Sequence, residues 1–112
     1  MNRIVVGDDI RIIINLTKDG DTFDIDTDAI VEMVLTTDGE IVLGPIAAIS
    51  TEDDADWTIS KIVFIMTSTD TEELTPNTKA TIEVQIDDPV NSDGKTTWLN
   101  VGEISFAQGY ID

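Results

Sequence analysis

Strict alternation of apolar and polar residues between Lys79 and Asp87 constrains the fold of this chain more than any other feature. Within this stretch every second residue is apolar, namely Ala80, Ile82, Val84 and Ile86. Such alternation is typical of a β-strand that has one face in a core and the other in water. Residues 9–16 repeat the pattern through Ile10, Ile12, Ile14 and Leu16. A chain built from segments of this kind is expected to fold as β-sheets packed face to face.

Short segments of strand character recur along the chain and are separated by turn residues. The predicted strands cover residues 3–6, 9–16, 29–36, 40–43, 46–49, 57–66 and 79–87, with the last one or two strands at 96–106 and a brief edge-like strand at 23–25. Asp19-Gly20 and Asp38-Gly39 are hairpin signals, because a type I′ turn needs positive φ at both central residues. Gly44-Pro45 breaks one strand, a change of parity near Ser60-Lys61 predicts a bulge, and residues 69–74 could form one helical turn at most.

About seven to nine short strands at turn spacings of about 8–12 residues predict an all-β fold, specifically an antiparallel β-sandwich. At 112 residues the chain is close to the commonest domain size, so we expect residues 1–112 to form a single domain. The parity of apolar residues within each strand predicts a core that includes Ile12, Ile14, Met33, Phe64, Leu74, Ile82, Val84 and Phe106.

The charge of the chain excludes several classes of partner. It has 6 Lys and Arg against 23 Asp and Glu, which gives a formal charge of −17. Such a protein would repel a phosphate backbone and an anionic membrane surface, so we expect neither nucleic acid nor membrane as partner. Two interpretations of the charge stay open: solubility together with protection of exposed sheet edges, or attraction to a basic partner or a saline environment.

Processing signals are not evident. The apolar run Ile4-Val5-Val6 is too short for a signal peptide, and no stretch approaches the ~18 apolar residues of a membrane span. We therefore expect a complete, unprocessed product made in the cytoplasm. The chain has no cysteine, which excludes disulfides, thiolate metal sites and thiol nucleophiles.

Two acidic groups are the most site-like features of the sequence. In the first, Asp24, Asp26 and Asp28 alternate, so their carboxylates would lie on one side of an extended segment, and such oxygen ligands suit Ca²⁺. The segment fails to match an EF-hand loop, because Ala29 replaces the required glycine and Leu35 the required glutamate. We expect a solvated acidic edge, with no metal and no other cofactor.

The second acidic group lies just before Trp57 and consists of Glu52, Asp53, Asp54 and Asp56. Paired carboxylates can hydrolyse glycosides, but a sugar cleft is lined by aromatic residues, and the chain has few: Phe23, Trp57, Phe64, Trp98, Phe106 and Tyr110. There is no histidine to activate a nucleophile and no glycine-rich phosphate loop. Trp57 and Trp98 each open a predicted strand, where core or rim packing is the commoner role. We expect no catalytic residue and no enzyme activity.

The corner Leu74-Thr75-Pro76-Asn77, followed by the alternating strand from Ala80, resembles the corner between the fifth and sixth strands of immunoglobulin-like and fibronectin-like sandwiches. In those folds a leucine plugs the core, a proline turns the chain, and a Gly or Asn precedes the central strand. Immunoglobulin domains usually place a tyrosine in that strand to tie the corner. Ala80 takes the corresponding inward place here, so the tyrosine-corner hydrogen bond is not expected.

The whole layout resembles, more specifically, the small immunoglobulin-like modules of tailed-bacteriophage virion proteins. The residues that carry the resemblance are Gly7-Asp8-Asp9-Ile10, Thr17-Lys18-Asp19-Gly20, Phe23-Asp24-Ile25, Ile30-Val31-Glu32-Met33, Leu74-Thr75-Pro76 and a closing Trp98…Ile104-Ser105-Phe106…Gly109. Such modules open baseplate upper proteins, sit in tail proteins, and occur alone as capsid-decorating proteins. This chain departs from them in two respects: it stops where many continue into a fibre or receptor-binding domain, and its middle loops are unusually acidic.

The resemblance implies a non-enzymatic structural component of a bacteriophage particle, made in the host cytoplasm and located in the virion. It would dock onto a larger capsid or tail protein through an edge strand or the loops at 19–28 and 88–94, and could form a homo-oligomer on the particle. The absence of a second domain favours capsid decoration over a tail or baseplate role. The alternative is a calcium- or carbohydrate-dependent adhesion module, which should bind Ca²⁺ or glycan as an isolated monomer. An enzyme comes third and would need a cleft with perturbed carboxylates.

Overall fold

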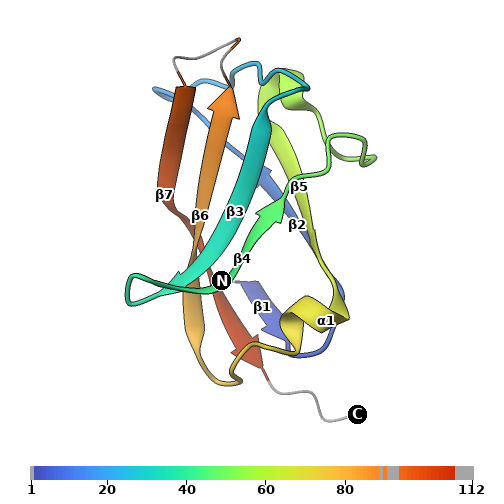
Figure 1. Ribbon diagram of the computed structural model, residues 1–112, viewed down its shortest axis with the longest axis vertical. Helices are drawn as coiled ribbons and strands as arrows, with labels where there is room; N and C mark the ends of the chain where they lie inside the picture. The colour runs from blue at the N-terminus through green and yellow to red at the C-terminus, as the bar shows by residue number, and fades with distance from the viewer. Residues whose placement is uncertain (1, 89, 91–93, 108–112) are drawn as a thin grey trace.

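The computed structural model describes residues 2–88, 90 and 94–107, and within them the chain is an all-β sandwich of two packed sheets (Figure 1). The larger sheet has the strand order β1-β7-β6-β3-β4, and β2 pairs with β5 in the smaller one. The strands are β1 (Asn2–Val5), β2 (Ile10–Asn15), β3 (Ile30–Thr37), β4 (Glu40–Ala47), β5 (Lys61–Met66), β6 (Lys79–Asp88) and β7 (Gly94–Ala107). The predicted all-β sandwich is therefore confirmed.

The long alternating strand lies at the centre of the larger sheet. β6 pairs antiparallel with β3 on one side and with β7 on the other, and β1 adds to the far side of β7 in parallel. The predicted final one or two strands are a single β7, whose register against β6 shifts between Ile82 and Val84. Asn100 of β7 has a φ of 54°.

The two Asp-Gly turns have different outcomes. Asp38 and Gly39 have φ values of 53° and 83° and connect β3 to β4, so the predicted hairpin is confirmed. Asp19 and Gly20 also have positive φ, but their turn closes only an isolated bridge between Lys18 and Asp21. The chain then crosses between the sheets, because β2 pairs with the distant β5. The edge-like strand predicted at 23–25 is wrong, since this segment carries no strand.

Two predicted interruptions take a different form in the structure. Gly44-Pro45 does not end its strand: β4 continues through it, and the register against β3 shifts nearby. The change of parity near Ser60 is not a bulge within one strand. Residues Trp57–Ile59 form a short 3₁₀ helix, η1, and Ser60 has a φ of 51° before β5 begins at Lys61. The prediction that Trp57 and Trp98 open strands is wrong, since Trp57 opens η1 and Trp98 lies inside β7.

The core lies between the two sheets, as the alternation predicts. All eight predicted core residues are buried, with exposed fractions of at most 9%. They belong to one cluster that also contains Leu16, Ile25, Val31, Leu35, Leu43, Trp57, Ile62, Met66, Ala80, Ile86 and Ile104. The inward position predicted for Ala80 is confirmed.

A single turn of helix, α1 (Ser68–Thr71), follows β5 and corresponds to the predicted helical turn. Thr67 and Asp70 form a capping box at its start. The buried hydroxyl of Thr71 accepts a hydrogen bond from the Gly7 N–H (3.0 Å) and donates one to the Asp8 carbonyl (2.6 Å). These two hydrogen bonds attach Gly7 and Asp8, which precede β2, to α1. Gly109, one of the residues that carry the resemblance, lies outside the described residues. No described helix is long and apolar enough to cross a membrane.

Candidate functional site

One end of the sandwich gathers the loops that the sequence singles out. The buried Asp88, at the end of β6, accepts hydrogen bonds from the backbone N–H of Asp26 (3.0 Å) and of Val90 (3.1 Å). The loop at 19–28 and the start of the loop at 88–94 are therefore held together, although they lie 62 residues apart. The role of Asp88 in joining the two loops was not predicted. Asp88 nevertheless lies two residues after Ile86 and continues the inward-facing series of Ile82, Val84 and Ile86, so the alternation could have predicted its burial.

Aromatic packing covers the neighbouring part of the same end. The rings of Phe23 and Trp98 stack with centroids 5.5 Å apart and planes within 2°. The Lys18 ammonium lies 5.6 Å from the Phe23 centroid, and the indole N–H of Trp98 donates to the Thr17 carbonyl (3.2 Å). Trp98 thus packs at the rim and anchors the segment that follows β2.

The acidic group Asp24, Asp26 and Asp28 does not lie along an extended edge. Asp26 Oδ2 accepts a hydrogen bond from the Asp28 N–H (3.1 Å), which closes a local turn. Asp24 and Asp26 instead line an open hollow of about 520 Å³ with Asp56, Trp57 and loop residues 50–51. No three acidic side chains of the described residues are arranged to hold a metal ion.

Trp57 forms part of the wall of that hollow and is 7% exposed. Its indole nitrogen is buried without a hydrogen-bond partner among the described residues. The neighbouring Asp56 caps η1, because its carboxylate accepts a hydrogen bond from the Thr58 N–H (3.2 Å). Asp56 is therefore used for local structure.

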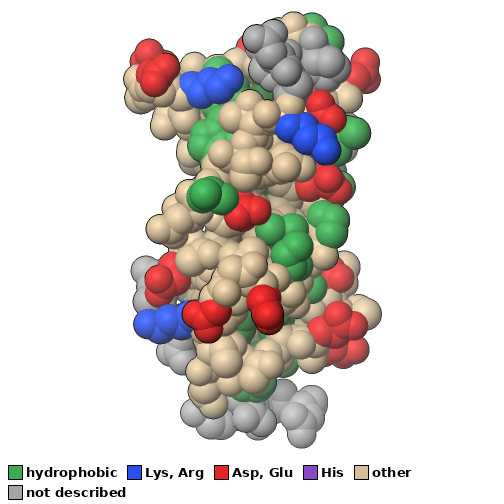
Figure 2. Space-filling model, turned by 60° about the vertical axis from the view of Figure 1, so that its left-hand side comes forward, with side chains coloured by type: hydrophobic (Ala, Val, Ile, Leu, Met, Phe, Trp, Pro, Cys, Tyr) green, Lys and Arg blue, Asp and Glu red, His purple; other side chains and the backbone are tan. Residues whose placement is uncertain are grey.

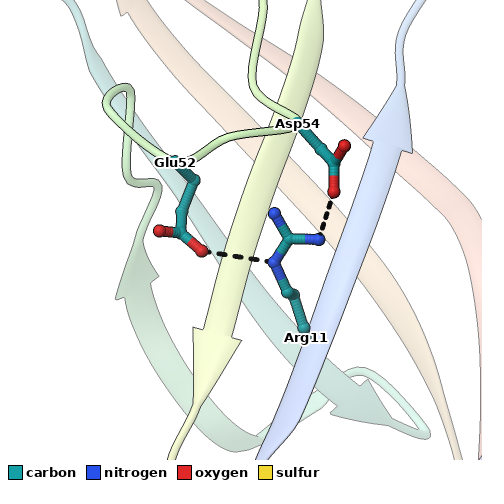
Figure 3. A network of polar contacts seen from close by, with 3 residues as sticks. All are labelled: Arg11, Glu52 and Asp54. Carbon is teal, nitrogen blue, oxygen red and sulfur yellow. Dashed lines mark hydrogen bonds and ion pairs between the residues drawn. The ribbon is translucent and has the colours of Figure 1, made fainter.

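Two further members of the second acidic group, Glu52 and Asp54, bind an arginine. Arg11 of β2 reaches across β5 to the loop beyond it, where its guanidinium binds Glu52 (3.2 Å) and Asp54 (Figure 3). The hydrogen bond that Arg11 donates lowers the pKa of the Asp54 carboxyl, and the bonds that Arg11 donates to Asp54 and then to Glu52 raise its own pKa. Sequence reasoning missed this network, because its partners lie 41 and 43 residues from Arg11.

The surface as a whole is acidic with scattered apolar side chains. Figure 2 shows one face, on which acidic groups extend from one end of the molecule to the other with hydrophobic groups between them. The large exposed hydrophobic residues are Ile13, Ile30, Ile41, Val42, Ile49, Ile59, Val90 and Leu99. Such a surface can contact a partner through both charge and apolar packing.

Three of the four sheet edges are shielded. β1 has only four residues, and β4 contains Pro45, which has no N–H to offer. Along the outer side of β5, the Val63 carbonyl accepts from the Ile49 N–H (3.0 Å), and Lys61 exchanges two backbone hydrogen bonds with Asp56 (3.0 Å each). β2 is six residues long, contains no proline, and has no neighbour on its outer side among the described residues. The outer edge of β2 is therefore the candidate docking site.

Comparison with known proteins identifies no relative: no family model, curated protein or solved structure matches this chain.

Proposed function

We propose that this protein is a non-enzymatic structural component of a bacteriophage particle that docks onto a larger capsid or tail protein. Capsid decoration is the first candidate role, and a tail or baseplate component is the second. On this proposal the protein is made in the host cytoplasm, ends in the virion, and acts by binding rather than by catalysis.

The strand order supports an immunoglobulin-like class within the all-β sandwiches. β7, β6, β3 and β4 are neighbours in one sheet and pack against β2 and β5 in the other. In chain order, these correspond to the G, F, C and C′ strands of a variable-type immunoglobulin domain opposite its B and E strands. This correspondence agrees with the resemblance to the phage modules drawn from the corner at Leu74 and Pro76.

The single observation that carries the docking role is the open edge of β2. An exposed edge offers unpaired N–H and C=O groups to another chain, and natural proteins commonly protect such edges. Here the remaining edges are short, interrupted or covered, whereas no residue that the structure describes covers the edge of β2. The acidic surface adds attraction towards a partner with a basic surface.

The test is to purify phage particles from a lysate through a density gradient and to search them for this chain by mass spectrometry. We expect the chain in intact particles at a constant ratio to a shell or tail protein. Separated heads and tails then decide between the two roles, because a decorating protein stays with heads. If the chain is absent from particles and remains soluble in the lysate without a partner, the virion role is wrong.

One observation favours the second candidate function, a calcium- or carbohydrate-dependent adhesion module. The hollow beside Trp57 combines the carboxylates of Asp24 and Asp26 with an indole wall, and such groups can contact a sugar. Titration of the isolated protein with Ca²⁺ and with a glycan array tests this candidate. Binding of either by the monomer, lost on Asp24→Ala, would favour adhesion over the virion role.

A further inference from the structure

The hydrogen-bond pattern shows which groups β2 leaves unpaired. The Leu16 N–H donates to the Ser60 carbonyl (3.1 Å), and the register pairs Ile10 with Met66 and so on along both strands. In an antiparallel ladder, alternate residues bond to the neighbouring strand and those between them point away. The even-numbered residues of β2 therefore bond to β5, whereas Arg11, Ile13 and Asn15 direct their N–H and C=O groups outward. No described residue makes a backbone hydrogen bond to these outward groups.

Hydrogen bonds anchor the chain at both ends of this edge. Before β2, the Asp8 carbonyl accepts from Thr71, and the Asp9 carboxylate accepts from the Ser68 N–H. After β2, the Leu16 carbonyl accepts from the buried Ser60 hydroxyl (2.7 Å), and Trp98 holds the next residue. A strand fixed in this way loses little conformational freedom on binding, so an added strand would meet a pre-organised template.

The side chains along the edge also suit a partner strand. Ile13 is apolar and 42% exposed, between the exposed Arg11 and Asn15 on the outer face, so it can pack against a cross-strand apolar residue. Arg11 is engaged by Glu52 and Asp54 and thus does not present an uncompensated positive charge. Asp8 and Asp9 precede the strand, so the charged groups flanking the edge favour a basic segment.

We propose that the outer edge of β2 accepts an extended segment of a partner protein as an additional strand. This segment alternates apolar residues with Lys or Arg. The inference rests on the proposed docking function and deepens it by naming the contact and the chemistry of the partner. A second copy of this chain is the less favoured occupant, because association would bring two formal charges of −17 together.

The test uses the isolated protein and a synthetic peptide that alternates lysine with valine and matches β2 in length. In nuclear magnetic resonance experiments on the protein alone, the amide protons of Arg11, Ile13 and Asn15 should exchange quickly, and those of Ile12 and Ile14 slowly. Adding the peptide should shift the three outward amides and slow their exchange. A peptide with glutamate in place of lysine should bind at least about tenfold more weakly, with the difference shrinking as salt rises.

Two variants assign the binding to this edge. Ile13→Pro removes an outward N–H and leaves the bonds of β2 to β5 intact, so it should abolish peptide binding. Ile13→Lys keeps the backbone and should weaken binding by adding a positive charge beside a basic strand. The matched control is Ile41→Lys, the same change at an exposed residue of β4, which should bind as the parent protein does.

Three results would overturn the proposal. These are slow exchange of all three outward amides without peptide, absence of peptide binding, and equal peptide binding by Ile13→Lys and Ile41→Lys. A dimer in sedimentation that protects the same amides would assign the edge to a second copy and overturn the basic partner. These measurements use no particles, so their failure is distinguishable from absence of the chain from virions.

Discussion

At the scale of single residues, stability depends on the side chains enclosed between the two sheets. Ile82 and Val84 lie on β6, in the middle of the larger sheet, and are 3% and 0% exposed. Their neighbours Glu83 and Gln85 face outward on the same strand. The energetic consequence of a truncation should therefore change from one residue to the next along this strand.

We expect Ile82→Ala or Val84→Ala to lower the free energy of unfolding by about 2–4 kcal/mol, because each leaves a cavity in a packed core. Urea denaturation measures this loss. The matched control Gln85→Ala, on the exposed face of the same strand, should change it by about 0.5 kcal/mol or less. A loss below about 0.5 kcal/mol at both core positions would contradict the predicted core.

The carboxylate of Asp54 gives a prediction about pH. Its pKa is lowered by the hydrogen bond from Arg11, so the contact stabilises the folded state above the ordinary pKa of aspartate. This contribution is lost as the pH falls through the lowered value. Asp54→Asn should therefore reduce the melting temperature slightly at about pH 7, and this difference should shrink as the pH falls towards about 2 and through the lowered pKa.

The control for this measurement is Asp53→Asn, which removes a neighbouring charge outside the network with Arg11. It should not reproduce the pH-dependent difference. If Asp54→Asn lowers the melting temperature equally at both pH values, the ion pair with Arg11 is not the cause.

At the scale of elements, β4 depends on a glycine that lets two backbones approach closely. Gly44 has a φ of +107°, and a Cβ at this position would lie 2.8 Å from the Met33 carbonyl oxygen. Gly39 in the β3–β4 turn also has a positive φ, +83°, but a Cβ there would meet nothing within 4 Å. Alanine substitutions at the two glycines therefore distinguish the cost of backbone strain alone from the cost of strain together with a steric clash.

We expect Gly39→Ala to cost about 1–2 kcal/mol, from left-handed backbone strain alone. Gly44→Ala should cost clearly more, because the added methyl group also displaces β3. Chemical denaturation of both variants measures the difference. Equal losses would mean that the backbone of β4 shifts easily at this position.

At the scale of the whole molecule, the acidic charge is spread over surface and loops, and the described carboxylates do not form a closed metal cage. We therefore predict that folding requires no tightly bound metal. Thermal melts in chelator and in millimolar Ca²⁺ should nearly coincide. A rise of many degrees in Ca²⁺ that Asp26→Ala abolishes would contradict this prediction and strengthen the adhesion candidate.

Local patterns in the sequence predicted most of the strands and their inward faces. Alternation is a property of neighbouring residues, so Ile82 and Val84, or Ile12 and Ile14, indicate their own burial. The turn at Asp38-Gly39 is equally local. The strand predicted at residues 23–25 was wrong, because a contact distant in the sequence buries Ile25. Its N–H donates to the Trp57 carbonyl of η1 (2.8 Å), so the segment packs against η1 without pairing as a strand.

Only the tertiary structure decided how these elements combine and where a partner could bind. The contact of Arg11 with Glu52 and Asp54, and that of Asp88 with Asp26, join residues that are far apart in the sequence. Within the described part of the chain, the edge of β2 is open because β1 pairs with β7 and not with β2, while Ile49 and Asp56 cover the edge of β5. The alternation determines which face of a strand is buried, whereas the pairing of distant strands determines which edge remains exposed.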